Sequence, residues 1–244
     1  MTNKYIYFVA NWKMFGKLKT LNSLNKVISF VKKFKKNKFK LIYCPPATLL
    51  SPLNDKLKDS SIQVGAQNCH ESDSYGANTG QINSGMLKAV GAKYVILGHS
   101  ENRKLGESDN LINLKIKNSI KAGLKIIFCV GETLSQKRKK KTKKILSRQI
   151  SQGLKKIKNK KNIIIAYEPV WAIGSGLVPK NSEIIDIAKF IRDKVKASKV
   201  LYGGSVNNKN INLLKKINNV DGFLVGGASQ NSNNFIDIIK KTFK

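Results

Sequence analysis

The sequence predicts an α/β protein of the (β/α)8 class, in which eight parallel strands close into a barrel surrounded by helices. Short β-branched or aromatic runs alternate with amphipathic, lysine-faced segments along the whole chain. The strand-like runs are apolar on both faces, which is typical of a parallel sheet covered by helices. Eight such units within 244 residues indicate a closed barrel. We therefore predict a single domain over residues 1–244.

Eight strands and eight helices are expected, and each helix follows a strand. The predicted strands span 5–10, 40–44, 62–66, 94–97, 126–130, 163–167, 200–202 and 222–225. The predicted helices span 18–31, 47–57, 84–90, 111–122, 134–157, 183–195, 211–217 and 235–241. A doubly wound open sheet is the structural alternative, but no GxGxxG motif follows an early strand and no change in composition marks a second domain.

The chain is strongly basic, with 46 Lys and Arg against 14 Asp and Glu and a formal net charge of +32. Such a charge ordinarily suggests an anionic polymer or surface as a partner. Here the basic residues are spread over nearly every helical segment, and even the densest run, 137–144, lacks interleaved aromatic residues. We predict no nucleic-acid partner. No apolar run approaches the roughly 18 residues of a membrane span, so we predict a cytoplasmic protein without a membrane partner.

Three cysteines, Cys44, Cys69 and Cys129, are scattered along the chain without CxxC spacing. An odd number of isolated cysteines indicates reduced thiols rather than a disulfide framework or a zinc site. A nucleophilic cysteine remains the alternative, although no recognisable motif places a histidine beside one.

The longer polar connections, 67–83, 99–110, 168–180 and 203–210, all follow the carboxyl ends of predicted strands. In a parallel barrel these ends share one face, where the active sites of this fold are built. Asn11 and Lys13 follow the first strand, His99 the fourth and Glu168 the sixth. We expect these four side chains to meet at one mouth of the barrel, although each alone would be read as an ordinary surface or salt-bridge residue.

His99 and Glu168 have local sequences that suit proton transfer. Ser100 is expected to cap a helical turn, which places His99 near the positive end of a helix dipole and favours a neutral imidazole. Glu168 precedes the apolar segment 169–176, which is bounded by proline and glycine. A mobile lid there would exclude water and make the carboxylate a stronger base. His70, in the loop after the third strand, is expected to make a structural or interface hydrogen bond.

Two glycine-rich turns follow the seventh and eighth strands. Gly203, Gly204 and Ser205 form the first turn, and Gly226 and Gly227 begin the second. Adjacent turns with free backbone N–H groups at this place in a barrel form a recurrent phosphate site. The alternative is a pair of ordinary tight turns.

Six sequence blocks, in their order and spacing, resemble the triosephosphate isomerase family nearly from end to end. They are Asn11-Trp12-Lys13, Gly98-His99-Ser100-Glu101, Cys129-Val130-Gly131-Glu132, the run 167–174 (YEPVWAIG), the run 202–206 (YGGSV) and the run 225–229 (VGGAS). The resemblance implies a TIM barrel that interconverts dihydroxyacetone phosphate and D-glyceraldehyde 3-phosphate in glycolysis and gluconeogenesis. It implies proton transfer through an enediolate, with neither metal nor cofactor.

The resemblance also implies a role for each site residue. Glu168 is expected to be the base, His99 the neutral electrophile, and Lys13 with Asn11 the electrostatic stabilisers of charge on the substrate oxygens. The segment 169–176 is expected to be the lid. The phosphate is expected to be held by the backbone amides of Gly174, Ser205, Gly226 and Gly227. The residues expected to support the catalytic side chains are Ser100, Glu101, Glu107 and Cys129.

Two departures from the family pattern concern assembly. The chain has Gln81 where the family commonly has a glutamate, and Asn102 where it commonly has an arginine. In the family these side chains pair across a dimer interface. Replacing both charged residues costs less free energy than leaving one charge without its partner. We therefore expect a homodimer that depends less on electrostatic attraction, with Thr79 reaching the neighbouring subunit. Ser175, at a position that is often threonine, is a mild change.

Two rival functions use the same observations. Another phosphate-binding barrel, such as a sugar-phosphate epimerase or an indole-forming synthase, would share the two glycine turns but lacks the combination of Asn11, Lys13, His99 and Glu168. A basic binding protein on a barrel scaffold without catalysis would retain nucleic acid in a salt-sensitive way. The charge of +32 would alternatively steer a dianionic substrate.

Overall fold

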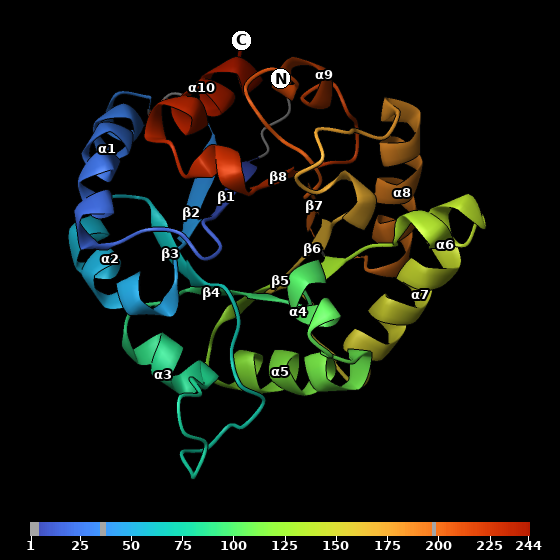
Figure 1. Ribbon diagram of the computed structural model, residues 1–244, viewed down its shortest axis with the longest axis horizontal. Helices are drawn as coiled ribbons and strands as arrows, with labels where there is room; N and C mark the ends of the chain where they lie inside the picture. The colour runs from blue at the N-terminus through green and yellow to red at the C-terminus, as the bar shows by residue number, and fades with distance from the viewer. Residues whose placement is uncertain (1–4, 35–37, 197–198) are drawn as a thin grey trace.

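Eight parallel strands close into a barrel in the order β1 to β8, which confirms the predicted fold class. The computed structural model describes residues 5–34, 38–196 and 199–244, and Figure 1 shows the strands encircled by helices. Within these residues the strands are β1 (Ile6–Asn11), β2 (Phe39–Cys44), β3 (Gln63–Ala66), β4 (Tyr94–Leu97), β5 (Lys125–Val130), β6 (Ile163–Tyr167), β7 (Lys199–Tyr202) and β8 (Gly222–Val225). Each predicted strand matches one of them within a residue at either end.

The outer ring is made of helices that follow the strands. In the described residues these are α1 (Leu24–Lys33), α2 (Leu50–Leu57), α3 (Ser84–Ala89), α4 (Ser100–Lys104), α5 (Asp109–Lys121), α6 (Leu134–Arg138), α7 (Thr142–Gly153), α8 (Asn181–Lys194), α9 (Ile211–Leu214) and α10 (Ser232–Thr242). Short 3₁₀ turns lie at η1 (Leu18–Ser23), η2 (Ala47–Leu49), η3 (Val170–Ala172) and η4 (Gly227–Ser229).

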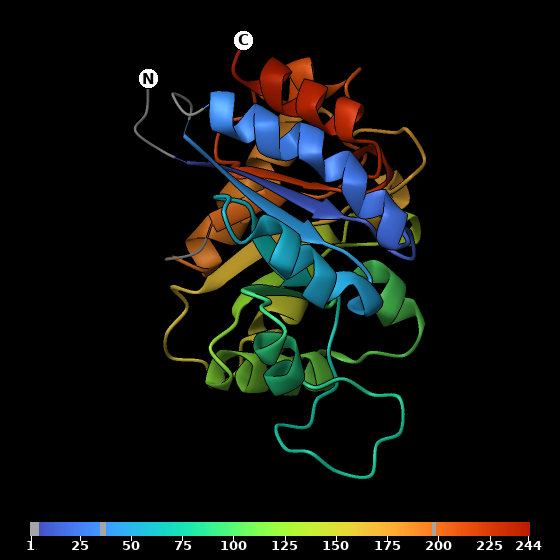
Figure 2. The same cartoon turned by 90° about the vertical axis from the view of Figure 1, so that its left-hand side faces the viewer.

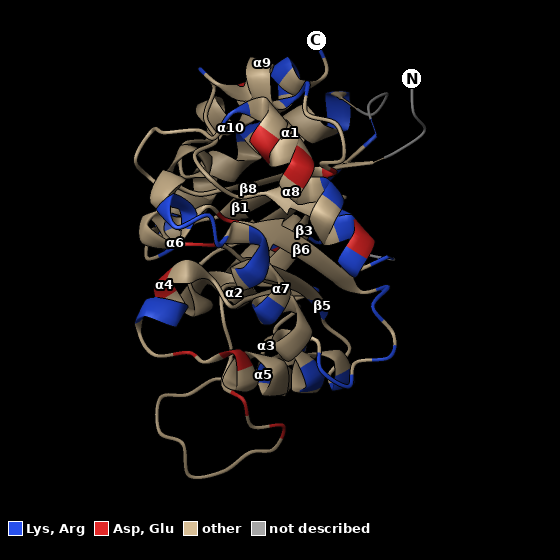
Figure 3. Ribbon diagram, turned by 90° about the vertical axis from the view of Figure 1, so that its right-hand side faces the viewer, with Lys and Arg blue, Asp and Glu red and all other residues tan. Residues whose placement is uncertain are grey.

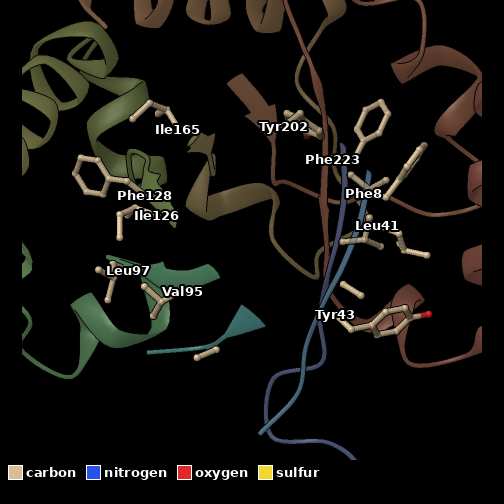
Figure 4. Packing of buried hydrophobic residues seen from close by; sticks show 14 of the residues in the cluster. Phe8, Leu41, Tyr43, Val95, Leu97, Ile126, Phe128, Ile165, Tyr202 and Phe223 are labelled. Carbon is tan, nitrogen blue, oxygen red and sulfur yellow. The ribbon is translucent and has the colours of Figure 1, made fainter. Parts of the chain in front are cut away.

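The core has two layers because successive side chains of a strand point to opposite faces. In β1, Tyr7 and Val9 point into the barrel, whereas Phe8 and Ala10 pack against the helices. Figure 4 shows the outer layer, where Phe8 and Phe223 from neighbouring strands lie side by side. Strands that are buried on both faces explain why the sequence shows apolar runs instead of an apolar–polar alternation.

The helix predicted over 134–157 is wrong in two respects, because it is two helices, α6 and α7, with a break between them, and because α7 ends at Gly153. Lys140 at the break has φ of 53°, a left-handed conformation that ends α6. The break falls inside the basic run 137–144, where like charges crowd together. Lys137 and Lys143, on either side of it, form ion pairs with acidic residues of α8.

Smaller differences concern where helices begin and end. The segment predicted as helix from residue 18 opens with the 3₁₀ turn η1, and α9 ends at Leu214. The last helix begins at Ser232 rather than at 235, because the Asn231 side chain accepts hydrogen bonds from the N–H groups of Asn233 and Asn234 and caps it.

The loop 67–83 after β3 projects from the body of the barrel in both views (Figures 1 and 2). Its tip is open to solvent, with Tyr75 81% exposed. In the view of Figure 3, basic residues lie on several outer helices, including α4, α6 and α8, and are not gathered on one of them. Among the described residues, no helix has the length and apolar character needed to cross a bilayer.

Candidate active site

A cavity of about 230 Å³ opens at the carboxyl ends of the strands. It brings together the residues predicted to act on or bind the substrate, namely Asn11, Lys13, His99, Glu168, Gly174, Ser205, Gly226 and Gly227. A larger hollow of about 750 Å³ lies between α1 and α10, away from all of these side chains. Size alone therefore does not identify the site, whereas the convergence of polar groups does.

Glu168 is held directly after β6, where its backbone N–H donates to the carbonyl oxygen of Val130 at 2.8 Å. Its side chain is buried, with Oε1 3.2 Å from His99 Nε2 and Oε2 accepting from the Ser100 N–H at 3.4 Å. Burial raises the pKa of this carboxyl above its ordinary value of 4.5, against the opposing effects of His99, the Ser100 amide and a hydrogen bond from the Cys129 thiol. The carboxylate is thus a stronger base than an exposed glutamate.

His99 is the N-cap of α4, because its Nδ1 accepts a hydrogen bond from the Glu101 N–H at 3.2 Å. The expectation that Ser100 caps this turn is wrong. Ser100 is the first residue of the helix, and its N–H is left to point at Glu168. The Nδ1 atom therefore acts as a hydrogen-bond acceptor at this cap, and the Nε2 atom faces Glu168.

Lys13 reaches the cavity from an unusual backbone position with φ of 56°. Asn11, the last residue of β1, accepts from the Lys13 N–H through its side-chain oxygen at 3.1 Å. Gln67 Nε2 donates to the carbonyl oxygens of Lys13 and Cys44, both at 2.8 Å. These bonds hold a left-handed conformation that costs a non-glycine residue free energy. The Lys13 ammonium pairs with Glu101 Oε1 at 2.5 Å.

Gln67 and Glu132 are site residues to which the sequence analysis gave no role. The buried Glu132 carboxylate accepts from Trp171 Nε1 at 3.0 Å and from the Tyr167 hydroxyl at 3.3 Å. Burial raises its pKa, and the Trp171 bond opposes that rise. Gln67 directly follows β3, and Glu132 ends the block 129–132 that resembles the family. The partners that define their roles lie far away in the chain.

The two glycine turns present free amides to the cavity. In the part of the chain that the structure describes, the N–H groups of Ser205, Gly226 and Gly227 make no hydrogen bond. At Gly204 a Cβ would lie 2.3 Å from the Tyr202 hydroxyl oxygen, so only glycine fits there. Unobstructed amides that line a cavity suit an anion such as phosphate.

The supporting residues divide into two groups. The buried Cys129 thiol contacts the Glu168 carboxylate, which together with burial raises the thiol's own pKa, and Glu101 contacts Lys13. Glu107 instead pairs with Lys115 at 2.5 Å and accepts from Asn68. Glu107 therefore stabilises the loop after β3 rather than the side chains of the cavity.

The remaining predicted residues lie outside the cavity. His70 Nδ1 accepts from the Ser72 N–H at 3.1 Å, which confirms the structural hydrogen bond expected there. Thr79 and Gln81 are exposed in the projecting loop, and Asn102 is half-buried in α4. Among the described residues, no group of three or more His, Cys, Asp or Glu side chains is arranged to hold a metal ion.

Comparison with known proteins gives one family. The family model described as Triosephosphate isomerase matches residues 6–242. A triosephosphate isomerase of Thermodesulfovibrio yellowstonii is 41% identical, covering 98% of this chain and 100% of its own, and one of Bartonella quintana is 39% identical, covering 95% and 94%. A crystal structure of triosephosphate isomerase from Bartonella henselae superimposes with a TM-score of 0.89 at 36% identity, covering 98% of this chain and 99% of the other.

Proposed function

The chain belongs to the triosephosphate isomerase family, and on that premise we propose how its cavity carries out the family's reaction. The reaction is the interconversion of dihydroxyacetone phosphate and D-glyceraldehyde 3-phosphate, a step of glycolysis. The observation that carries the residue roles is the approach of Glu168 Oε1 to His99 Nε2, 3.2 Å apart, in a cavity that also receives Lys13 and the two glycine turns.

Glu168 is the base that removes a proton from one carbon of the substrate and returns it to the adjacent carbon. Its carboxylate is buried and has a raised pKa, which strengthens it as a base. The Ser100 N–H and the Cys129 thiol hold it in place. The cavity of about 230 Å³ leaves room for one small sugar phosphate beside it.

His99 is the electrophile that donates its Nε2 proton to the substrate carbonyl oxygen and passes protons between the two oxygens of the enediolate. The hydrogen bond that Nδ1 accepts from the Glu101 N–H supports this role, because it leaves Nε2 as the nitrogen available to donate. Lys13 and Asn11 stabilise the negative charge that develops on these oxygens, a role that depends on fixed position. The bonds from Asn11 and Gln67 fix the Lys13 backbone.

The phosphate group is held by the backbone amides of Ser205, Gly226 and Gly227, and by Gly174 of the lid. The lid, 169–176, closes over the bound substrate. Closure excludes water and protects the enediolate, which would otherwise expel its phosphate. The hydrogen bond between Trp171 and Glu132 anchors the lid's first turn.

The base assignment predicts the acid side of the pH profile. Glu168 must be ionised to accept a proton, and its pKa lies above the ordinary value of 4.5. We expect kcat/KM to fall as the pH is lowered through that raised pKa, so the falling limb lies at a higher pH than an exposed glutamate would give. Steady-state rates between pH 4.5 and 8, with circular dichroism to show that the fold persists, measure it. A limb at or below pH 4.5 would remove Glu168 as the titrating base.

A homodimer built through the loop 67–83 is the proposed assembly. The loop projects from the barrel with an exposed tip, which suits insertion of Thr79 into a second copy. Gln81 and Asn102 carry no charge, so we expect added salt to break no ion pair between them and instead to screen the repulsion between two subunits of +32 each. Light scattering over a dilution series, at low and high ionic strength, is expected to give the mass of two subunits. A monomer at high protein concentration would refute the dimer.

We propose no nucleic-acid or membrane partner. Basic residues lie on several of the outer helices (Figure 3), and the densest basic run, 137–144, has no interleaved aromatic residue. Because the reaction belongs to glycolysis and gluconeogenesis, we propose that the enzyme works in the cytoplasm.

A further inference from the structure

Lys137 of α6 lies against the lid. Its ammonium nitrogen is 4.0 Å from the centroid of the Trp171 ring and donates to Glu183 Oε2 at 3.0 Å. Trp171 belongs to the first turn of the lid, η3. Glu183 lies in the first turn of α8, the helix that follows the lid, where it also accepts from the Lys180 N–H at 3.2 Å. A single ammonium group therefore contacts the lid near its start and the helix that begins just after its end.

Trp171 is held on two sides. The edge of its indole donates to the buried Glu132 carboxylate, and its face lies under the Lys137 ammonium. The positive charge of Lys137 also favours the ionised form of Glu132, opposing the pKa rise that burial causes. The indole thus sits between an anion that accepts its N–H and a cation that its ring attracts.

The lid tip is exposed and is not bonded to the phosphate amides. Gly174, Ser175 and Gly176 are exposed, and within the described residues no hydrogen bond joins 173–177 to the turn at 203–207, although Gly174 lines the same cavity as Ser205. When the Gly174 N–H donates to a phosphate that Ser205 also holds, we expect the exposed segment to close further over the cavity. Trp171 lies in the same short segment, so its contacts must change as the tip moves.

We propose that Lys137 is a positioning residue that clasps the open lid through contacts with Trp171 and Glu183 that are given up when the lid closes. This inference rests on the proposed role of 169–176 as a lid. A cation over a partly exposed indole and an exposed ion pair are both weak. Removing the ammonium shifts the open–closed equilibrium by about two- to fivefold toward the closed lid. A ligand that binds the closed lid better then binds more tightly.

Lys137→Gln tests the clasp, with inorganic phosphate as the probe. Its inhibition constant against substrate, and its dissociation constant from a tryptophan fluorescence titration, are each expected to fall about two- to fivefold. Lys143→Gln is the matched control. Lys143 also pairs with an acidic residue of α8, Asp186, at 2.8 Å, and the variant loses the same charge without touching the lid.

Three outcomes separate the possibilities. Tighter phosphate binding in Lys137→Gln alone, restored to the wild-type value in Lys137→Arg, supports the clasp. Equal phosphate constants in the two Gln variants, or weaker binding in Lys137→Gln than in Lys143→Gln, overturn it and leave the proposed function intact. If the wild-type enzyme turns over normally but inorganic phosphate neither inhibits it nor changes its tryptophan fluorescence, the proposed role of 169–176 as a lid is overturned, and the clasp with it.

Discussion

Glu168→Ala is expected to lower kcat on the order of 10³-fold. The substitution removes the proposed base, and no other carboxylate lines the cavity among the described residues. His99, Lys13 and the phosphate amides remain, so KM should change far less than kcat. Steady-state assays with both substrates, in both directions, measure the effect.

Two control variants separate loss of the base from loss of the fold. Glu71→Gln removes a carboxylate from the projecting loop, outside the cavity, and should turn over at the wild-type rate. Glu168→Gln keeps the side chain's volume and its acceptor for the Ser100 N–H but cannot take a proton. It should be as slow as Glu168→Ala. Near-normal turnover by either Glu168 variant would overturn the assignment of the base.

Lys13→Met is expected to lower kcat/KM by about 10²- to 10³-fold, because the enediolate loses a fixed positive charge. Methionine and lysine have similar length, and both must adopt the positive φ at this position, so the backbone cost is unchanged. Glu101 loses its partner in the variant. The double variant Lys13→Met with Glu101→Gln shows whether that uncompensated carboxylate contributes to the loss.

Lys189→Met controls for the change in net charge. Lys189 is exposed on α8, so its loss lowers the charge of the enzyme equally without altering the cavity. Comparison of the two variants at low and high salt separates a local effect from general attraction of an anionic substrate. A Lys13→Met enzyme as fast as Lys189→Met would contradict the electrostatic role.

The strands and the cavity were predictable from sequence because both depend on local patterns. Runs such as 163–167 are apolar throughout, and Glu168 follows one of them directly, so its position at the barrel mouth follows from the topology alone. The helix break at Lys140 was not predictable in this way. The run 137–144 contains no glycine or proline to mark a break, and the ion pairs on either side of the break involve residues of α8.

The finer parts of the site depend on contacts between distant segments. Gln67 bonds to Lys13 and Cys44, and Glu132 bonds to Trp171, partners that no local pattern reveals. The cap of α4 was misassigned because serine is the commoner capping residue, whereas here the His99 imidazole fills that role. Glu107 was expected near the cavity but pairs with Lys115 of α5.

Isomerisation in D₂O tests most directly whether a protein carboxylate carries the proton between the two carbons. On the proposed mechanism, the proton taken up by Glu168 is expected to exchange with solvent before it is returned in at least part of the turnovers. Dihydroxyacetone phosphate converted to equilibrium by the wild-type enzyme should therefore yield glyceraldehyde 3-phosphate with carbon-bound deuterium next to the carbonyl, as read by NMR. Product that carries only the original hydrogen after many turnovers would contradict transfer through a carboxyl that exchanges its proton with solvent.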